Sequence, residues 1–277
     1  MIKTKLPELD YLKFKLTKDT IQLYAQLLSA IKGKFTPHQK NWEEFSLKIY
    51  AKGFTTTPIP IETGNGIEAL DLNLNIVEHK LKIFFADKRE SVDLLQPNIK
   101  AFTNELVSKL ESYNIKIDLD DKFLSDKDFN YSTSESEKLW TVIRLISFAL
   151  LEFKGKQLLE TSNINFWAHH FDLAMLMFTG RLIPDQDPEN WDYSREQMNI
   201  GFSLGDEGIT EPYFYITAYP FPTNSFNKTL PGNMFWHTEG WNGAVMKYRE
   251  LLVKGELEIK LKEFLEKVSE IILSKMV

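Results

Sequence analysis

Hydrophobic residues recur at helical spacing in four stretches of the chain. An apolar residue at every third or fourth position is typical of a helix with one buried face. Thr17 is placed to cap the first helix, and Pro97 occupies the first turn of the second. Ser134 and Glu137 form a capping box at the start of the third. The pattern predicts helices over about 18–32, 97–113, 134–151 and 256–275.

Between these helices, hydrophobic and polar residues alternate, as in strands that have one buried and one solvated face. Short turns at 78–80 and 205–208 join neighbouring strands into hairpins. Antiparallel hairpins between helices, rather than a strict alternation of strand and helix, indicate an α+β fold. The alternation predicts strands over 44–51, 70–76, 81–85, 167–178, 198–204 and 211–220.

The two sides of a polar stretch at 119–137 resemble each other. Each side has a helix, then the letters KGK (32–34 and 154–156), then Trp, Phe, Leu, Gly and Ile-Pro in the same order. We therefore expect one compact body over 1–277 made of two similar α-β-β-β-α halves, 1–120 and 131–277, with antiparallel sheet flanked by helices. The spacings match only with small gaps, so coincidence is the alternative.

Composition is that of an ordinary globular protein, with 43% hydrophobic and 26% charged residues. Its formal net charge is −6 and its Lys and Arg residues are scattered, which argues against nucleic acid as a partner. The chain has no Cys, so disulfides and thiolate metal sites are excluded. No apolar stretch suits a signal peptide or a membrane span, and we expect a cytoplasmic protein without a membrane partner.

The segment NFWAHHFDLAML (165–176) is the first candidate for chemistry. In a strand, His170 and Asp172 share one face at a separation of about 6.6–6.8 Å, while His169 points to the other face. At this separation the two side chains can both contact one ligand or metal ion. The duplication pairs Asp172 with Ser46, and His170 with Glu44, so only the second half carries the pair. The alternative is a strand histidine and an Asp with purely structural partners.

Two further segments supply polar and aromatic groups. In EPYFYITAY, Glu211, Tyr213 and Tyr215 share one parity with Thr217 and Tyr219, which suits a cavity for a small ligand or, alternatively, an exposed face with tyrosine pairs. In FWHTEGWNGAV, the spacing His-x-Glu recurs between two tryptophans. Two His and two carboxylates suit zinc, manganese or iron, but no spacing is diagnostic, so we predict no metal site. The residues of this segment are Trp236, His237, Glu239 and Trp241.

Several of these segments resemble an uncharacterised bacterial family, known only as a domain of unknown function. HFDLA, GFSLGD, EPYFY and WHTEGWNGA carry the resemblance, and GFTTTPIP and VEHKLKI extend it to the first half. The chain departs at Ala168-His169, where Pro-Glu is usual, and at Leu204, where Pro is usual. No activity follows from the family. By position, the resemblance points to His170, Asp172, Ser203, Asp206, Glu211 and Tyr213.

The sequence thus predicts a small-molecule site with a possible hydrolase-like or acid–base function on the second half. In that role His170 is the base, oriented by Asp172 or Glu211, while the cofactor stays unknown. The alternative is a non-enzymatic module that binds a ligand or a partner protein, with polar residues that are only structural. The expected ligand-binding residues are Ser203, Asp206, Tyr213, Tyr215, Trp236, His237, Glu239 and Trp241.

Overall fold

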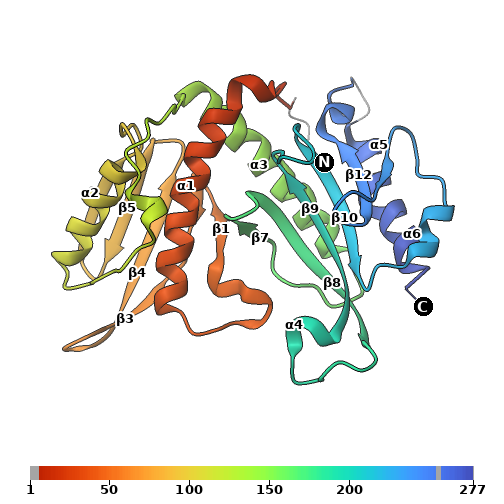
Figure 1. Ribbon diagram of the computed structural model, residues 1–277, viewed down its shortest axis with the longest axis horizontal. Coiled ribbons are helices and arrows are strands. Elements are labelled where there is room, and N and C mark those ends of the chain that lie inside the picture. Colours follow the sequence, from red (N-terminus) through yellow and green to blue (C-terminus); the bar gives the residue numbers. More distant parts are fainter. Residues whose placement is uncertain (1–5, 254–256, 277) are drawn as a thin grey trace. The chain divides into compact units, whose positions relative to one another are not determined.

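The computed structural model describes residues 6–253 and 257–276. Contacts between residues divide the chain into two compact units. Helices and antiparallel sheet occur in both units, which confirms the predicted α+β class (Figure 1). The N-terminal unit consists of Leu12–Trp140 and Asn165–Phe171, and the C-terminal unit consists of Met1–Tyr11, Thr141–Ile164 and Asp172–Val277.

The N-terminal unit contains an antiparallel sheet and the helices that cover one of its faces. Its elements are α1 (Tyr11–Phe35), η1 (Lys40–Phe45), β1 (Ser46–Tyr50), β2 (Gly53–Thr55), β3 (Ile59–Thr63), β4 (Gly66–Asn75), β5 (Lys80–Phe85), β6 (Lys88–Asp93), α2 (Ile99–Glu111), η2 (Asp121–Leu124) and β7 (Asn165–Trp167). The strand order is β7-β1-β2-β4-β5-β6, and β3 pairs with the first part of β4. Alternate strand residues such as Leu72, Leu74 and Ile83 are buried, and α1 and α2 lie over this sheet (Figure 1).

The C-terminal unit contains antiparallel sheet as well, with its strands in the order β8-β9-β10-β12-β11. The helix α3 begins in the N-terminal unit and continues into this one. Phe214 of the sheet contacts Phe264 of the last helix, with ring centroids 6.1 Å apart, so helices cover one face here as well. The elements are α3 (Thr133–Gly155), β8 (Asp172–Leu182), α4 (Trp191–Ser194), β9 (Arg195–Ser203), β10 (Tyr213–Tyr219), η3 (Thr223–Asn227), β11 (Phe235–His237), β12 (Gly243–Lys247), η4 (Tyr248–Leu252), α5 (Leu257–Lys262), η5 (Glu263–Val268) and α6 (Ser269–Leu273).

The first two helices do not begin as the capping signals predict. α1 begins at Tyr11, so Thr17 lies inside the helix, where its buried hydroxyl accepts a hydrogen bond from the Ser132 N–H instead of capping. α2 begins at Ile99, and the side chain of Asn98 caps it by accepting from the Ala101 N–H at 2.9 Å. The apolar stripe thus predicts a helix more reliably than it predicts the first residue of that helix.

The other two predicted helices are present with small shifts. α3 begins at Thr133, and Ser132 rather than Ser134 accepts from the backbone N–H of Glu135, at 3.3 Å. The last helix runs through α5, the π-helical stretch η5 and α6 without a break. Its predicted first residue, 256, lies outside the described residues.

The two units follow a similar plan. A helix precedes each run of strands, α1 before β1-β2-β4-β5-β6 and α3 before β8-β9-β10-β12-β11, and a helix follows each run. Ser46 and Asp172, which the duplication pairs, are the first residues of β1 and β8. The units also contain strands that the alternation does not predict, such as the mostly polar β6. The internal duplication stays a prediction.

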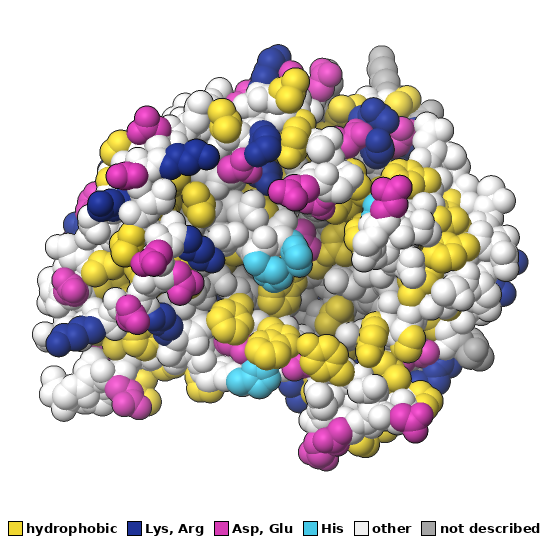
Figure 2. Space-filling model, viewed as in Figure 1, with side chains coloured by type: hydrophobic (Ala, Val, Ile, Leu, Met, Phe, Trp, Pro, Cys, Tyr) yellow, Lys and Arg dark blue, Asp and Glu magenta, His cyan; other side chains and the backbone are white. Residues whose placement is uncertain are grey.

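Acidic and basic side chains are interspersed on the face of the N-terminal unit that Figure 2 presents, on the left of the view. None of the helices in the described part of the chain has the length and apolar character that crossing a bilayer requires. The cytoplasmic location and the exclusion of nucleic acid as a partner stay predictions.

Candidate functional site

One face of the C-terminal sheet is polar and aromatic. Across β8, β9 and β10, Asp172 pairs with Ser203, and Ser203 pairs with Tyr213. The next residues on the same face are Ala174, Gly201 and Tyr215, followed by Leu176, Asn199 and Thr217. Because side chains alternate along a strand, Tyr213, Tyr215 and Thr217 share this face, as the parity predicts. The opposite face carries the hydrophobic core.

Tyr215 reaches across β9 to the carboxylate of Asp172. Its hydroxyl donates a hydrogen bond to Asp172 Oδ2. The ring passes over Gly201, where a Cβ atom would lie only 2.4 Å from Tyr215 Cζ. Asp172 is only 5% exposed, and burying a carboxylate costs free energy unless donors compensate it. A glycine in β9 therefore makes room for the contact that compensates a buried charge.

Both tyrosines keep their protons. Burial raises the pKa of Tyr215 well above its usual range, and the negative charge of Asp172 raises it further. Burial also raises the pKa of Tyr213, as does its 2.5 Å hydrogen bond to Asp206 Oδ2. Phenols with raised pKa values act as hydrogen-bond donors at neutral pH, not as bases.

Ser203 and Asp206 hold the turn between β9 and β10. Asp206 Oδ1 accepts hydrogen bonds from the N–H groups of Gly208 and Ile209, both at 2.8 Å. Ser203 Oγ accepts from the N–H of Gly205 at 3.1 Å. These two predicted ligand-binding residues thus have partners within the turn, and through Tyr213 the turn is tied to the polar face.

A small aromatic cluster lies on the polar face, separate from the main core. Tyr213, Ile209 and Val245 are buried, and Tyr215, Phe235 and Trp241 pack against them while partly exposed. Trp241 lies over Gly243, where a Cβ would be 2.5 Å from Trp241 Cζ3. Partly exposed rings beside buried polar groups are typical of small-molecule sites.

Only some of the predicted residues around His237 lie on this face. The His237 ring lies 4.4 Å from that of Trp241, and His237 Nε2 bonds to the Glu239 carbonyl at 2.8 Å. The Glu239 side chain is exposed. Trp236 follows the opposite parity of β11 and donates its indole N–H to the Lys228 carbonyl. Only His237 and Trp241 of this predicted group thus come together with the tyrosines.

Glu211 precedes β10 and is held by two cations. Its carboxylate lies 2.6 Å from Lys247 Nζ and 3.5 Å from Arg249 Nε. Lys247 pairs with Tyr213 across the sheet, so Glu211 lies near the edge of the polar face. Both oxygens of this carboxylate are thus engaged by cations of this chain.

The prediction of one strand over 167–178 is wrong near its start. β7 ends at Trp167 and β8 begins at Asp172, and a turn lies between them. Phe171 adopts a φ of 55°, and its N–H donates to the Trp167 carbonyl at 2.7 Å. His170 is exposed in this turn and belongs to the N-terminal unit, whereas Asp172 belongs to the C-terminal unit. The two residues therefore do not share the face of a strand.

Sequence reasoning missed two residues of the polar face, Gly201 and Asn199. The alternation in β9 assigned them no role beyond a polar or small position. Asn199 lies beside Thr217, and its Oδ1 is buried without a hydrogen-bond partner among the described residues. Buried acceptors normally have partners, so this oxygen marks a place where a donor is expected. The described residues contain no group of three or more His, Asp or Glu side chains that could hold a metal ion.

Replacing Gly201 by alanine is expected to separate Tyr215 from Asp172. The new methyl group would overlap the tyrosine ring, and a displaced ring leaves the carboxylate without that donor. We expect a loss of about 1–3 kcal/mol in the free energy of unfolding, measured by urea denaturation. Gly155→Ala is the control, because nothing lies within 4 Å of a Cβ at that position. A loss that is equal in the two variants would contradict the crossing of Tyr215 over β9.

Comparisons with known proteins match most of the chain to one family. A family model described as a family of unknown function (DUF5996) matches residues 6–272. The match spans both units and all the segments that carry the predicted resemblance. No curated protein and no solved structure matches the chain.

Proposed function

We propose that this chain, which belongs to the family of unknown function DUF5996, binds a small molecule on the polar face of its C-terminal sheet. The observation that carries the proposal is the buried Asn199 Oδ1, which lacks a partner among the described residues. It lies on the face that also carries the Asp172 carboxylate and the partly exposed ring of Trp241. Two acceptors beside aromatic rings suit a ligand with an apolar body and a hydrogen-bond donor.

A protonated amine fits these groups better than an anion does. The Asp172 carboxylate attracts a cation, and the faces of Tyr215 and Trp241, whose rings are 6.0 Å apart, favour a cation as well. An anionic ligand would meet the same carboxylate and would be repelled. The proposed ligand class is therefore a small amine with an aromatic or aliphatic body.

A saturation-transfer NMR experiment tests this proposal with benzylamine and benzoate as probes. We expect benzylamine to bind and benzoate not to bind. Asp172→Asn should weaken benzylamine binding about tenfold, because it removes the negative charge while it keeps the shape of the side chain. Asp185→Asn, at an exposed loop position, is the control for net charge and should leave binding unchanged.

Two results would contradict the proposal. One is binding of benzoate as strong as that of benzylamine. The other is benzylamine binding that is equal in Asp172→Asn and the unaltered protein. Thermal unfolding of each variant establishes that a change in binding does not reflect unfolding.

Acid–base catalysis on the same face is a second candidate function. The raised pKa of Tyr215 keeps the proton on its hydroxyl, which donates a hydrogen bond to the Asp172 carboxylate. A pKa this far above neutral makes Tyr215 a weak proton donor, so an acid–base role falls to the Asp172 carboxylate as a base. His170 and Glu211 support this function less, because His170 lies in an exposed turn and Glu211 in two ion pairs.

A further inference from the structure

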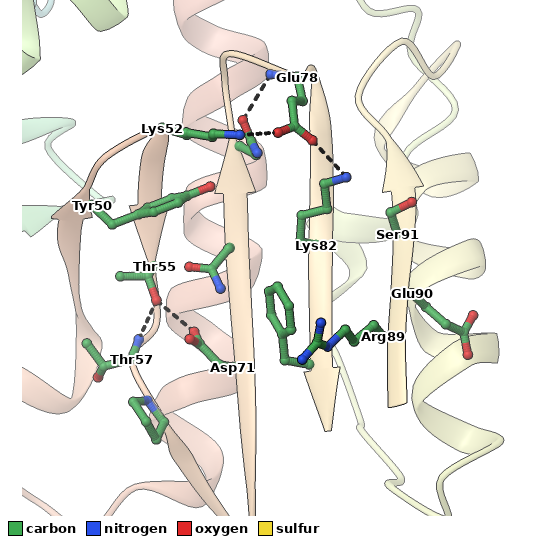
Figure 3. Close-up of a pocket in the computed structure, with 14 residues that line it drawn as sticks. Tyr50, Lys52, Thr55, Thr57, Asp71, Glu78, Lys82, Arg89, Glu90 and Ser91 are labelled. Atoms are coloured by element: carbon green, nitrogen blue, oxygen red, sulfur yellow. Dashed lines mark hydrogen bonds and ion pairs between the residues drawn. The ribbon is translucent and has the colours of Figure 1, made fainter. Parts of the chain in front are cut away.

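The N-terminal unit has a groove of about 880 Å³ on the face of its sheet that α1 and α2 leave uncovered (Figure 3). Across four strands, Thr55 pairs with Asn73, Asn73 with Lys82, and Lys82 with Ser91, and all four line the groove. Its volume is that of pockets that hold drug-sized ligands. This groove is built from residues distinct from those of the proposed amine site.

The charges of the groove largely compensate one another. Glu78 forms ion pairs with both Lys52 and Lys82, the second at 2.9 Å (Figure 3). Glu90 is held by Lys109, at 2.7 Å. The lining contains one further side chain of each charge, Arg89 and Asp71, so neither an anion nor a cation is strongly favoured as a ligand.

Neutral hydrogen-bonding groups, by contrast, remain available. The Tyr50 hydroxyl is buried and has no hydrogen-bond partner among the described residues. Figure 3 shows its ring extending from β1 over the groove. Asn73 is only 8% exposed, and its side chain lines the same groove. Buried polar groups normally have partners, so the Tyr50 hydroxyl calls for a ligand, and the Asn73 amide beside it can both donate and accept.

Other groups in the groove are already oriented. Asp71 Oδ1 accepts from the Thr55 hydroxyl at 2.7 Å, and Thr55 Oγ1 in turn accepts from the Thr57 N–H at 2.8 Å (Figure 3). The partly exposed ring of Phe84 adds an apolar surface beside Asp71, its partner across the sheet. A fixed carboxylate and an available amide, together with aromatic rings, suit a ligand that carries hydroxyl groups on a C–H framework.

We propose that this groove binds a neutral saccharide, with Tyr50, Asp71 and Asn73 bonded to its hydroxyl groups and the Phe84 ring against its C–H face. The length of the groove over four strands favours a short oligosaccharide over a single sugar. The site is independent of the amine site on the other sheet.

The experiment is a screen of the intact chain on an array of neutral glycans, followed by titration calorimetry with the best glycan. We expect binding of at least one neutral oligosaccharide and at least a fivefold weaker affinity in Tyr50→Phe, which removes only the hydroxyl group. Asn73→Ala should weaken binding as well. Tyr193→Phe makes the same chemical change at an exposed position and is the control, and Asp172→Asn should leave glycan binding unchanged.

The proposal is overturned if no neutral glycan binds, if Tyr50→Phe binds as tightly as the unaltered protein, or if inorganic phosphate competes with the glycan. Thermal unfolding within 2 °C of the unaltered protein, about half the shift expected from 1 kcal/mol in a domain of this size, shows that Tyr50→Phe is folded. The amine proposal and the saccharide proposal can be rejected independently, because benzylamine binding tests only the site on the C-terminal sheet.

Discussion

Replacing Gly53 by alanine is expected to destabilise the protein by about 3–5 kcal/mol, the largest effect of any substitution considered for this chain. A Cβ at this position would lie 2.0 Å from the carbonyl oxygen of Leu74, a backbone atom of the neighbouring strand. The oxygen cannot move away without a shift of β4, which pairs with both β2 and β5. Gly53 also has a φ of 157°, which side chains rarely adopt.

Urea denaturation followed by circular dichroism measures this loss. Gly64→Ala is the matched control, because it lies in the turn between β3 and β4 and has nothing within 4 Å of a Cβ. Alanine there should change the free energy of unfolding by less than about 1 kcal/mol and in the stabilising direction. Equal stability of the Gly53→Ala and Gly64→Ala proteins would show that β2 and β4 do not pair as described.

The second large effect is a rise in stability with pH that depends on Lys32. This side chain is only 6% exposed, and its ammonium group donates to the carbonyls of Ser46 at 2.6 Å and Glu43 at 3.1 Å. Burial lowers the pKa of Lys32 to about 8, and the charge of Lys48 lowers it further, while Glu43 and Glu44 act in the opposite direction. A positive charge at neutral pH is therefore unfavourable in the folded state.

The sign of the pH dependence follows from proton counts. Between pH 8 and the usual lysine value of 10.5, the unfolded chain keeps the proton that the folded chain has lost. Stability therefore rises with pH over this range, because the unfolded state binds more protons. The contribution approaches about 3 kcal/mol by pH 10.5, since each pKa unit corresponds to about 1.4 kcal/mol.

Lys32→Met isolates this contribution, since other titrating groups are common to both proteins. The free energy of unfolding is measured for both at pH 7, 8.5 and 10. Between pH 7 and pH 10, the free energy of unfolding of the unaltered protein should rise by at least about 1 kcal/mol relative to that of the variant. A constant difference between the two proteins across this range would mean that Lys32 titrates in the folded protein as it does in the unfolded chain.

The polar face of the C-terminal sheet was predictable from the sequence because its cause is local. Side chains alternate along β10, so Tyr213, Tyr215 and Thr217 share one face whatever the rest of the chain does. The contact of Tyr215 with Asp172 was not predictable in the same way. It depends on the register of three strands, which brings Gly201 between the two residues.

The turn before β8 shows a different limit. Phe171 is a bulky residue in a left-handed conformation, which its own sequence disfavours. Its ring is buried against Phe166, at a centroid distance of 5.0 Å, and against Phe54, at 6.4 Å. Packing against Phe166 and against the distant Phe54 thus overrides the local preference for a strand, and the predicted pairing of His170 with Asp172 depends on that strand.

The groove of the N-terminal unit illustrates a third limit. The alternation of Asp71, Asn73 and Asn75 along β4 correctly indicates a face that is not part of the main core. Alternation does not distinguish an open solvated face from one that a neighbouring side chain covers. Tyr50, which belongs to another strand, extends over this face, and only the pairing of the strands shows it (Figure 3).

The passage of Tyr215 over Gly201 also has a consequence for how this sequence can change over time. The ring occupies the space that any side chain at position 201 would need, so neither position can vary alone without a cost. A larger residue at 201 becomes tolerable only after a smaller one has replaced Tyr215, and Asp172 then buries a charge with one donor fewer. We therefore expect substitutions at positions 172, 201 and 215, which lie on three neighbouring strands, to occur together.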